Sequence, residues 1–112
     1  MTRSPSKLRI LPDAQDDIAD IKQGDPDGGS RILNAIKDWE RQIGWGRVPQ
    51  DHLTYLTGSK SYNFYRQRVG KSDYRVVYEI SGDLMTAVAV FPKDDNAYDL
   101  DEYRRRMDRN RR

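Results

Sequence analysis

The chain has 112 residues, of which 34% are charged, and 20 lysines and arginines against 18 aspartates and glutamates give a formal net charge of +2. This length predicts a single domain over 1–112 that buries roughly two-thirds of its unfolded surface, and the near balance of charge argues against general binding to polyanions. The absence of cysteine excludes disulfides and thiolate chemistry. No apolar stretch has the length of a signal-peptide core or a membrane span, so we expect a cytoplasmic protein without membrane contact.

The first part of the chain predicts one strand followed by two helices. Residues 7–11 alternate between polar and apolar, which is typical of a strand. A short helix is predicted over 13–24, and a second over 30–44, because an aspartate and a serine are suited to cap their first turns and a glycine ends each. The segment 25–29 between them has the composition of a loop. Four residues of the second helix are spaced to form one buried face: Ile32, Ile36, Trp39 and Ile43.

The middle of the chain predicts a β-hairpin. We expect 45–62 to be a long irregular connection. Two strand-like runs, 64–69 and 74–80, flank a short Gly-Lys-Ser-Asp turn, which is a hairpin signal. A tight turn at 81–83 then leads into the apolar run 84–91, which is typical of an inner strand.

The last part of the chain predicts a helix with a basic end. Residues 98–107 have the composition of a terminal helix. The arginine-rich segment 104–112 is predicted to be a flexible basic tail.

Three arginines of the predicted hairpin form a candidate site. Side chains alternate between faces along a strand, so Arg66 and Arg68 share one face, and Arg75 on the second strand is expected to lie near them. Such a cluster predicts a phosphate site, because the planar guanidinium binds phosphate through two hydrogen bonds. Lys60 and Lys71 add positive charge here and are predicted to bind the substrate. The alternative is a solvated sheet face, with the aliphatic stems of the arginines lying along it.

The segment 64–80 also resembles the signature hairpin of the RelE/ParE toxin superfamily. The resemblance is carried by Tyr-Arg-Gln-Arg-Val-Gly, a short turn and Tyr-Arg-Val-Val-Tyr-Glu-Ile, and is extended by Leu-Thr-Gly at 56–58. It implies an α+β fold in which two N-terminal helices pack on a small curved antiparallel sheet, with a C-terminal helix. It also implies a toxin of a type II toxin–antitoxin system that needs no cofactor and no metal and forms a hetero-oligomer with a cognate antitoxin protein.

Within this superfamily the resemblance favours the RelE-like branch, whose members are endoribonucleases that cut messenger RNA on the ribosome. The basic residues of that family's active site carry over onto Arg66, Arg68 and Arg75. The ribosome and messenger RNA are therefore expected partners. The resemblance further implies a role for three residues near the C-terminal end, in which Lys93 adds charge and a tyrosine stacks on a base or transfers a proton: Lys93, Tyr98 and Tyr103.

Two alternatives stay open from the sequence. The first is a ParE-like inhibitor of DNA gyrase on the same fold. The second is a catalytically weak remnant that only binds its partner, since Asp94 and Asp95 follow the last strand where RelE-like chains carry a basic pair. No general acid or base is assigned, and His52, the single histidine, is predicted to be a surface residue.

Overall fold

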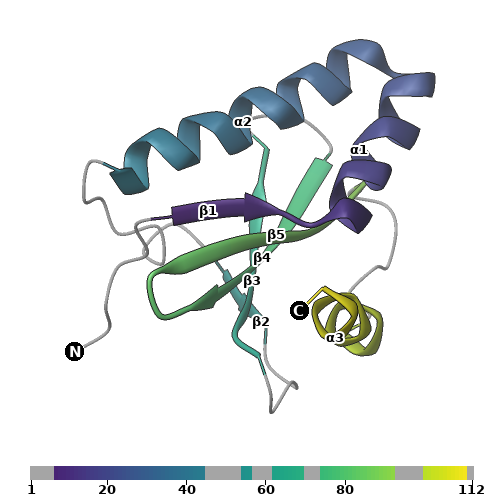
Figure 1. The fold of residues 1–112 in the computed structure, drawn as a ribbon. Coiled ribbons are helices and arrows are strands. Elements are labelled where there is room, and N and C mark those ends of the chain that lie inside the picture. The colour runs from purple at the N-terminus through teal and green to yellow at the C-terminus, as the bar shows by residue number, and fades with distance from the viewer. Residues whose placement is uncertain (1–6, 45–53, 57–61, 70–73, 93–99, 111–112) are drawn as a thin grey trace.

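The computed structural model describes residues 7–44, 54–56, 62–69, 74–92 and 100–110 (Figure 1). No helix within these ranges is long and apolar enough to cross a membrane. In chain order the elements are β1 (Lys7–Ile10), α1 (Pro12–Gly24), α2 (Pro26–Gly44), β2 (Thr54–Leu56), β3 (Phe64–Arg68), β4 (Tyr74–Ser81), β5 (Leu84–Pro92) and α3 (Leu100–Arg109).

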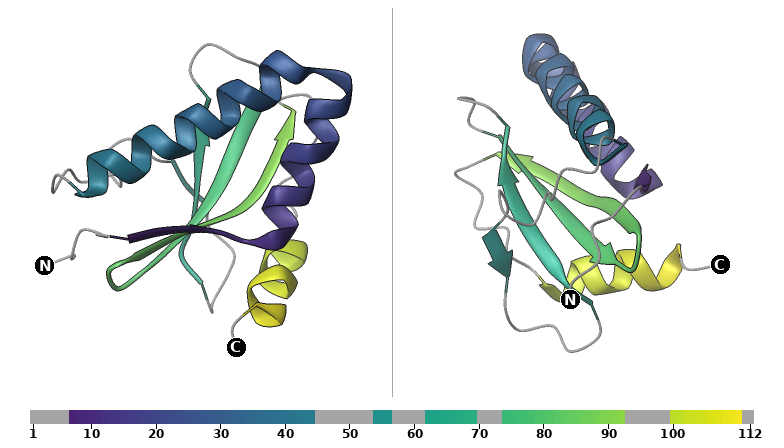
Figure 2. Two further views of the ribbon diagram at one scale, coloured as in Figure 1. Left: turned by 45° about the horizontal axis from the view of Figure 1, so that its top comes forward. Right: turned by 90° about the vertical axis from the view of Figure 1, so that its left-hand side faces the viewer.

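The strands form one sheet in the order β1-β5-β4-β3-β2. The helices α1 and α2 lie on one side of it and α3 on the other (Figure 2), so the predicted α+β fold is confirmed. The sheet itself is mixed rather than purely antiparallel, because β1 pairs with β5 in parallel while the other three pairings are antiparallel. Parallel pairing is possible here because β1 and β5 are joined through almost the whole chain and not by a tight turn.

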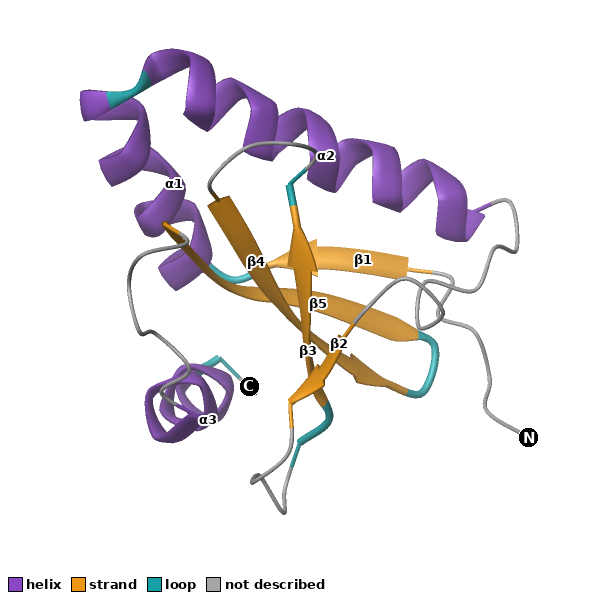
Figure 3. Ribbon diagram, turned by 180° about the vertical axis from the view of Figure 1, so that it is seen from behind, coloured by secondary structure: helices purple, strands orange, loops and turns teal. Residues whose placement is uncertain are grey.

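Each face of the sheet has its own apolar core. The first core packs α2 onto the sheet, and all four residues of the predicted helix face are buried: Ile32, Ile36, Trp39 and Ile43. The second core lies under α3, where Tyr103 and Met107 pack against Phe64, Val77 and Phe91 of the sheet. The rings of Phe64 and Tyr103 meet edge to face, with centroids 5.9 Å apart. Because α3 is held through this second core, it covers part of the face opposite α2 (Figure 3).

The predicted hairpin is confirmed as β3 and β4, and the next turn contains Gly82 with a φ of +60°, a conformation that glycine adopts without strain. The predicted irregular connection over 45–62 contains a strand that the sequence analysis missed, β2, which pairs with β3 at the edge of the sheet. A strand of three residues is too short to show alternation, so only its hydrogen bonds to β3 define it.

The second helix begins at Pro26, and not after the predicted loop 25–29. The Oδ1 atom of Asp25 accepts a hydrogen bond from the backbone N–H of Gly28 at 3.0 Å, which is the usual arrangement of an N-cap, and proline is favoured at the first helical position. Gly28 is required by close packing, since a Cβ there would come within 2.7 Å of Cε2 of Tyr74 and closer still to the Asp25 carboxylate. The glycines that suggested a loop therefore serve the packing of this corner.

Substitution of Gly28 by alanine is expected to lower the free energy of unfolding by about 1–3 kcal/mol, because the Asp25 carboxylate and the Tyr74 ring must move to admit a methyl group. Gly24→Ala is the matched control. A Cβ at this last residue of α1 meets nothing within 4 Å, and alanine favours a helix by up to about 1 kcal/mol, so this variant should keep or gain stability. Chemical denaturation of the three proteins measures both effects, and equal losses would contradict the packing explanation.

The predicted flexible tail over 104–112 is wrong for 104–109, which belong to α3. Two arginines of this segment form ion pairs with α1: Arg106 with Asp17 at 2.7 Å and Arg109 with Asp13 at 3.1 Å. These partners come from the other end of the chain, so the local composition gave no sign of them.

Candidate functional site

The three predicted arginines lie on one face of the β3–β4 hairpin. Arg68 is directly opposite Arg75, and Arg66 is opposite Val77. Residues that face each other across an antiparallel pair project from the same side of the sheet. The register therefore brings Arg66, Arg68 and Arg75 together on what we call the arginine face.

The arginine face is the side of the sheet on which α3 packs. Val77 and Phe91, which lie opposite Arg66 and Arg75, both belong to the core under α3. The first core, on the other side of the sheet, is covered by α1 and α2. Among the described residues, the helical hairpin of α1 and α2 packs mainly on the first core, although Ala14 of α1 reaches the core under α3, and α3 covers apolar side chains of this side of the sheet.

Arg68 and Arg75 are two cations that face each other across the ladder. Arg68 is exposed and Arg75 is half-buried. Within the described ranges neither forms an ion pair, and Nη1 of Arg75 donates a hydrogen bond to the carbonyl of Tyr74 at 3.2 Å. Like charges directly opposite each other destabilise a sheet, so an anion bound between them would relieve that repulsion.

The other predicted site residues are placed differently. Tyr103 is only 3% exposed and packs on Phe64, so its described contacts are those of a core residue. The remaining predicted residues lie outside the described ranges: Lys60, Lys71, Lys93 and Tyr98.

The arginine face also carries a buried carboxylate that the sequence analysis did not single out. Glu79 lies opposite Phe64 on β3 and opposite Thr86 on β5, and it is only 2% exposed. Its Oε2 atom accepts a hydrogen bond from the backbone N–H of Asn63 at 3.3 Å. Glu79 alternates with Arg75 and Val77 along β4, so the sequence alone indicates that these three side chains share a face. This carboxylate holds the residues at the start of β3, the strand that presents Arg66 and Arg68.

The helical hairpin is tied to the arginine-bearing hairpin at one corner. The hydroxyl of Tyr74 donates a hydrogen bond to Oδ2 of Asp25 at 2.9 Å. The pKa of Asp25 is lowered, first by the backbone N–H of Gly28, then by this hydroxyl and by the charge of Arg31, while burial acts in the opposite direction. Asp25 is therefore held as a carboxylate by the hydrogen bonds it accepts.

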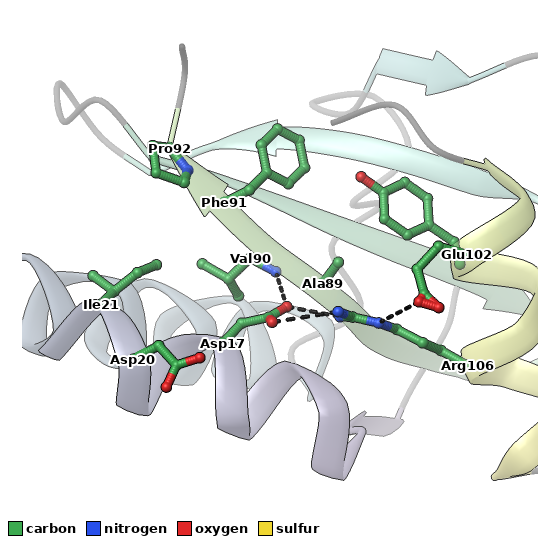
Figure 4. A pocket seen from close by; sticks show the side chains of 10 residues that line it. Asp17, Asp20, Ile21, Ala89, Val90, Phe91, Pro92, Glu102 and Arg106 are labelled. Atoms are coloured by element: carbon green, nitrogen blue, oxygen red, sulfur yellow. Dashed lines mark hydrogen bonds and ion pairs between the residues drawn. The ribbon is translucent and has the colours of Figure 1, made fainter. Parts of the chain in front are cut away.

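A cavity of about 310 Å³ lies between α1, the end of β5 and α3 (Figure 4). Asp17 binds Arg106 through both oxygens, at 2.7 and 3.4 Å, and also accepts the backbone N–H of Val90 at 3.0 Å. Arg106 donates in addition to the carbonyl of Val88 at 3.1 Å. The residues that line the cavity are Asp17, Asp20, Ile21, Ala89, Val90, Phe91, Pro92, Glu102, Tyr103 and Arg106.

The polar groups of this cavity are engaged in holding α3. Burial on its own lowers the pKa of the Arg106 guanidinium, but the hydrogen bond to Asp17 and the charge of that carboxylate outweigh it, so the pKa is raised. Both side chains are mostly buried, at 17% and 21% exposed. The cavity thus lies where α1, β5 and α3 meet. It adjoins the arginine face, because Phe91, which lines it, lies opposite Arg75.

Among the residues that the structure describes, no three histidine, cysteine, aspartate or glutamate side chains are grouped so that they could hold a metal ion. The described part of the arginine face carries fixed positive charge and, on the same side of the sheet, a buried carboxylate.

Fold and site together define a small α+β protein that presents arginines on a sheet face opposite its helical hairpin. No protein-family model matches this sequence, and no curated protein matches it. Among solved structures, it is similar to a chain of the archaeal RelE–RelB complex from Pyrococcus horikoshii OT3, with a TM-score of 0.52 and 19% sequence identity, covering 85% of this chain and 99% of that one. The protein therefore has the RelE-like fold that the hairpin resemblance implied.

Proposed function

We propose that this protein is the toxin of a type II toxin–antitoxin system and acts as a ribosome-dependent endoribonuclease that cuts messenger RNA and inhibits translation. The observation that carries the proposal is the pair Arg68 and Arg75, directly opposite each other without an ion pair in the described ranges, beside Arg66 on a RelE-like fold. A scissile phosphate is the anion that this arrangement suits best, because each guanidinium offers a fork of donors to its oxygens.

The proposed reaction proceeds by attack of the 2′-hydroxyl of a nucleotide on the adjacent phosphorus. The new bond between the 2′ oxygen and phosphorus forms as the bond to the 5′ oxygen breaks, and negative charge builds on the phosphate oxygens. Arg75, with Arg66 and Arg68, stabilises that charge, which is the largest effect available to fixed cations. Lys60 and Lys71 are proposed to bind the RNA backbone.

Two protons move in this reaction, one from the 2′-hydroxyl and one to the leaving 5′ oxygen. Arginine does not readily release its proton, so the arginines supply charge and not acid–base catalysis. Lys93 and Tyr98 stay the proposed candidates for added charge, base stacking or proton transfer, whereas Tyr103 is buried in the core under α3 and is not placed to stack on a base. Orientation of the RNA by the ribosome contributes to the rate, since positioning alone is worth several kcal/mol.

The proposed protein partner is an antitoxin. The similar solved structure is a RelE–RelB complex, and we propose that this chain likewise forms a hetero-oligomer with a cognate antitoxin that neutralises it.

Inducible expression of the chain alone tests the proposal. We expect growth arrest and loss of translation, with new 5′ ends within the coding regions of messenger RNA, and relief on co-expression of the cognate antitoxin. Ribosome-protected fragments and primer extension locate the cuts. DNA breaks with intact translation would instead support the gyrase inhibitor, and harmless expression with retained antitoxin binding would support the binding remnant.

A further inference from the structure

Asp25 joins three elements of the structure, α1, α2 and β4. Its backbone N–H donates to the carbonyl of Ile21 in α1 at 2.7 Å, and its carbonyl accepts the N–H of Gly29 in α2 at 3.0 Å. Its carboxylate accepts the N–H of Gly28 through one oxygen and the hydroxyl of Tyr74 through the other. The corner between the two helices is thus bonded to the first residue of β4.

Both the side chain and the backbone carbonyl of Tyr74 are held by hydrogen bonds. Its hydroxyl reaches the helical corner, and its ring packs against the first core. Its carbonyl accepts two hydrogen bonds, from the backbone N–H of Val69 at 3.1 Å and from Nη1 of Arg75 at 3.2 Å. Successive residues of a strand project to opposite faces, so the ring points to the helices while the next side chain, Arg75, projects from the arginine face.

The geometry points to Asp25 and Tyr74 as positioning residues that hold the guanidinium of Arg75 from the opposite side of the sheet. The hydrogen bond to Asp25 fixes the Tyr74 ring and hence its peptide unit, and the carbonyl of that unit is an acceptor for Arg75. Gly28 contributes to the same arrangement, because the absence of a side chain there lets the Tyr74 ring approach the corner between α1 and α2. This inference rests on the proposed function, in which Arg75 stabilises the scissile phosphate.

Tyr74→Phe tests the inference, because it keeps the ring and removes only the hydroxyl. On purified ribosomes carrying a defined messenger RNA, we expect the single-turnover rate constant of cleavage to fall roughly tenfold, since small misplacements of a charge-stabilising group are costly. The ribosome concentration that gives half the maximal rate should not change. NMR titration should show the Asp25 carboxyl pKa rising in the variant, because the hydroxyl no longer stabilises its charged form.

Tyr62→Phe is the matched control. It removes a hydrogen bond of the same kind, from the Tyr62 hydroxyl to Oδ1 of Asp108 at 2.6 Å, which lies between the start of β3 and α3. We expect it to lower stability to a similar extent while the cleavage rate stays within about twofold of wild type, because among the described residues the Tyr62 hydroxyl bonds to Asp108 and not to Arg75 or the Tyr74 carbonyl. An equal fall in rate for both variants would show a general effect of destabilisation and would overturn the inference.

A double-mutant cycle shows whether the two residues act together. Asp25→Asn keeps an oxygen for the Gly28 N–H but places an amide NH2, which is a donor, where the Tyr74 hydroxyl finds its acceptor. We expect the cleavage rates of Tyr74→Phe, Asp25→Asn and the double variant to be about equal. Each variant breaks the same hydrogen bond between Tyr74 and Asp25, so the second substitution has nothing further to remove. Multiplicative losses would show independent roles and overturn it.

An activity-free readout separates this inference from the proposed function. In ¹⁵N relaxation, the Nε–Hε group of Arg75 should be less ordered in Tyr74→Phe than in wild type and unchanged in Tyr62→Phe. If Arg75→Ala retains full cleavage, the proposed site is wrong, while the relaxation data still decide whether Tyr74 orders Arg75. If Arg75→Ala abolishes cleavage but Tyr74→Phe retains both the full rate and an ordered Arg75, the positioning inference is wrong and the function stands.

Discussion

Replacing Arg75 with alanine is expected to abolish toxicity and to lower the rate of messenger RNA cleavage by roughly 100- to 1,000-fold, the usual effect of removing one preorganised donor to a developing negative charge. Arg75 is half-buried on the sheet, and its guanidinium is held by the carbonyl of Tyr74. Loss of this side chain removes the cation opposite Arg68 and leaves no donor in its place. Growth after induction and single-turnover cleavage on ribosomes measure the two effects.

Two further variants control this experiment. Arg75→Lys keeps the charge but loses the planar fork, so its activity should lie between those of alanine and wild type. Arg41→Ala should remain fully toxic, because Arg41 is 67% exposed on α2 and pairs only with Asp38 of the same helix among the described residues. Full toxicity of Arg75→Ala at a wild-type protein level would show that the arginine face is not the active site.

Replacing Arg106 with alanine is expected to lower the free energy of unfolding by about 2–4 kcal/mol, because it leaves the Asp17 carboxylate mostly buried without its counter-ion. Arg106 holds α3 against both α1 and β5, through Asp17 and the carbonyl of Val88. Asp17→Ala should cost a similar amount, since it also takes the acceptor from the Val90 N–H. Urea denaturation measures these changes.

The matched control for Arg106 lies one residue away. Arg105 pairs with Glu102 at 3.6 Å but is 61% exposed, and exposed pairs of this kind contribute little, so Arg105→Ala should change stability by less than about 0.5 kcal/mol. The double variant at Asp17 and Arg106 should be less destabilised than the sum of the single variants, because the two share one interaction. Similar small effects at Arg105 and Arg106 would mean that α3 is held by its apolar contacts alone.

Elements with a local signal were predictable. The period of two in the hairpin, the apolar face of α2 and the apolar run of β5 each follow from which side of the element is buried. The shared face of Arg66 and Arg68 follows from the same alternation. That Arg75 faces Arg68, while Arg66 faces Val77, depends on the register, and the sequence analysis did not predict which arginine it would face.

Contacts and boundaries that depend on distant partners were not predictable, even where the element itself was, as for the helix predicted over 98–107. The packing of the start of α2 against Tyr74 joins residues 49 apart, and the pairing of α3 with α1 joins Arg106 to an aspartate 89 residues away. The strand β2 is defined only by its pairing with β3. The parallel pairing of β1 depends on β5, which lies at the other end of the chain. Composition signalled a loop and a flexible tail in the first two cases, because glycine, aspartate and arginine favour those states when nothing is packed against them.

The sequence by itself determined the class of fold and the chemical character of the site, since alternation and amphipathic spacing decide which side chains are buried and which arginines share a face. Only the tertiary structure decided how that site is supported. The helical corner at Asp25 meets Tyr74 behind Arg75, and α3 is bound to α1 beside the arginine face. These contacts join residues far apart in the chain, so they arise from packing the elements together and leave no local pattern in the sequence.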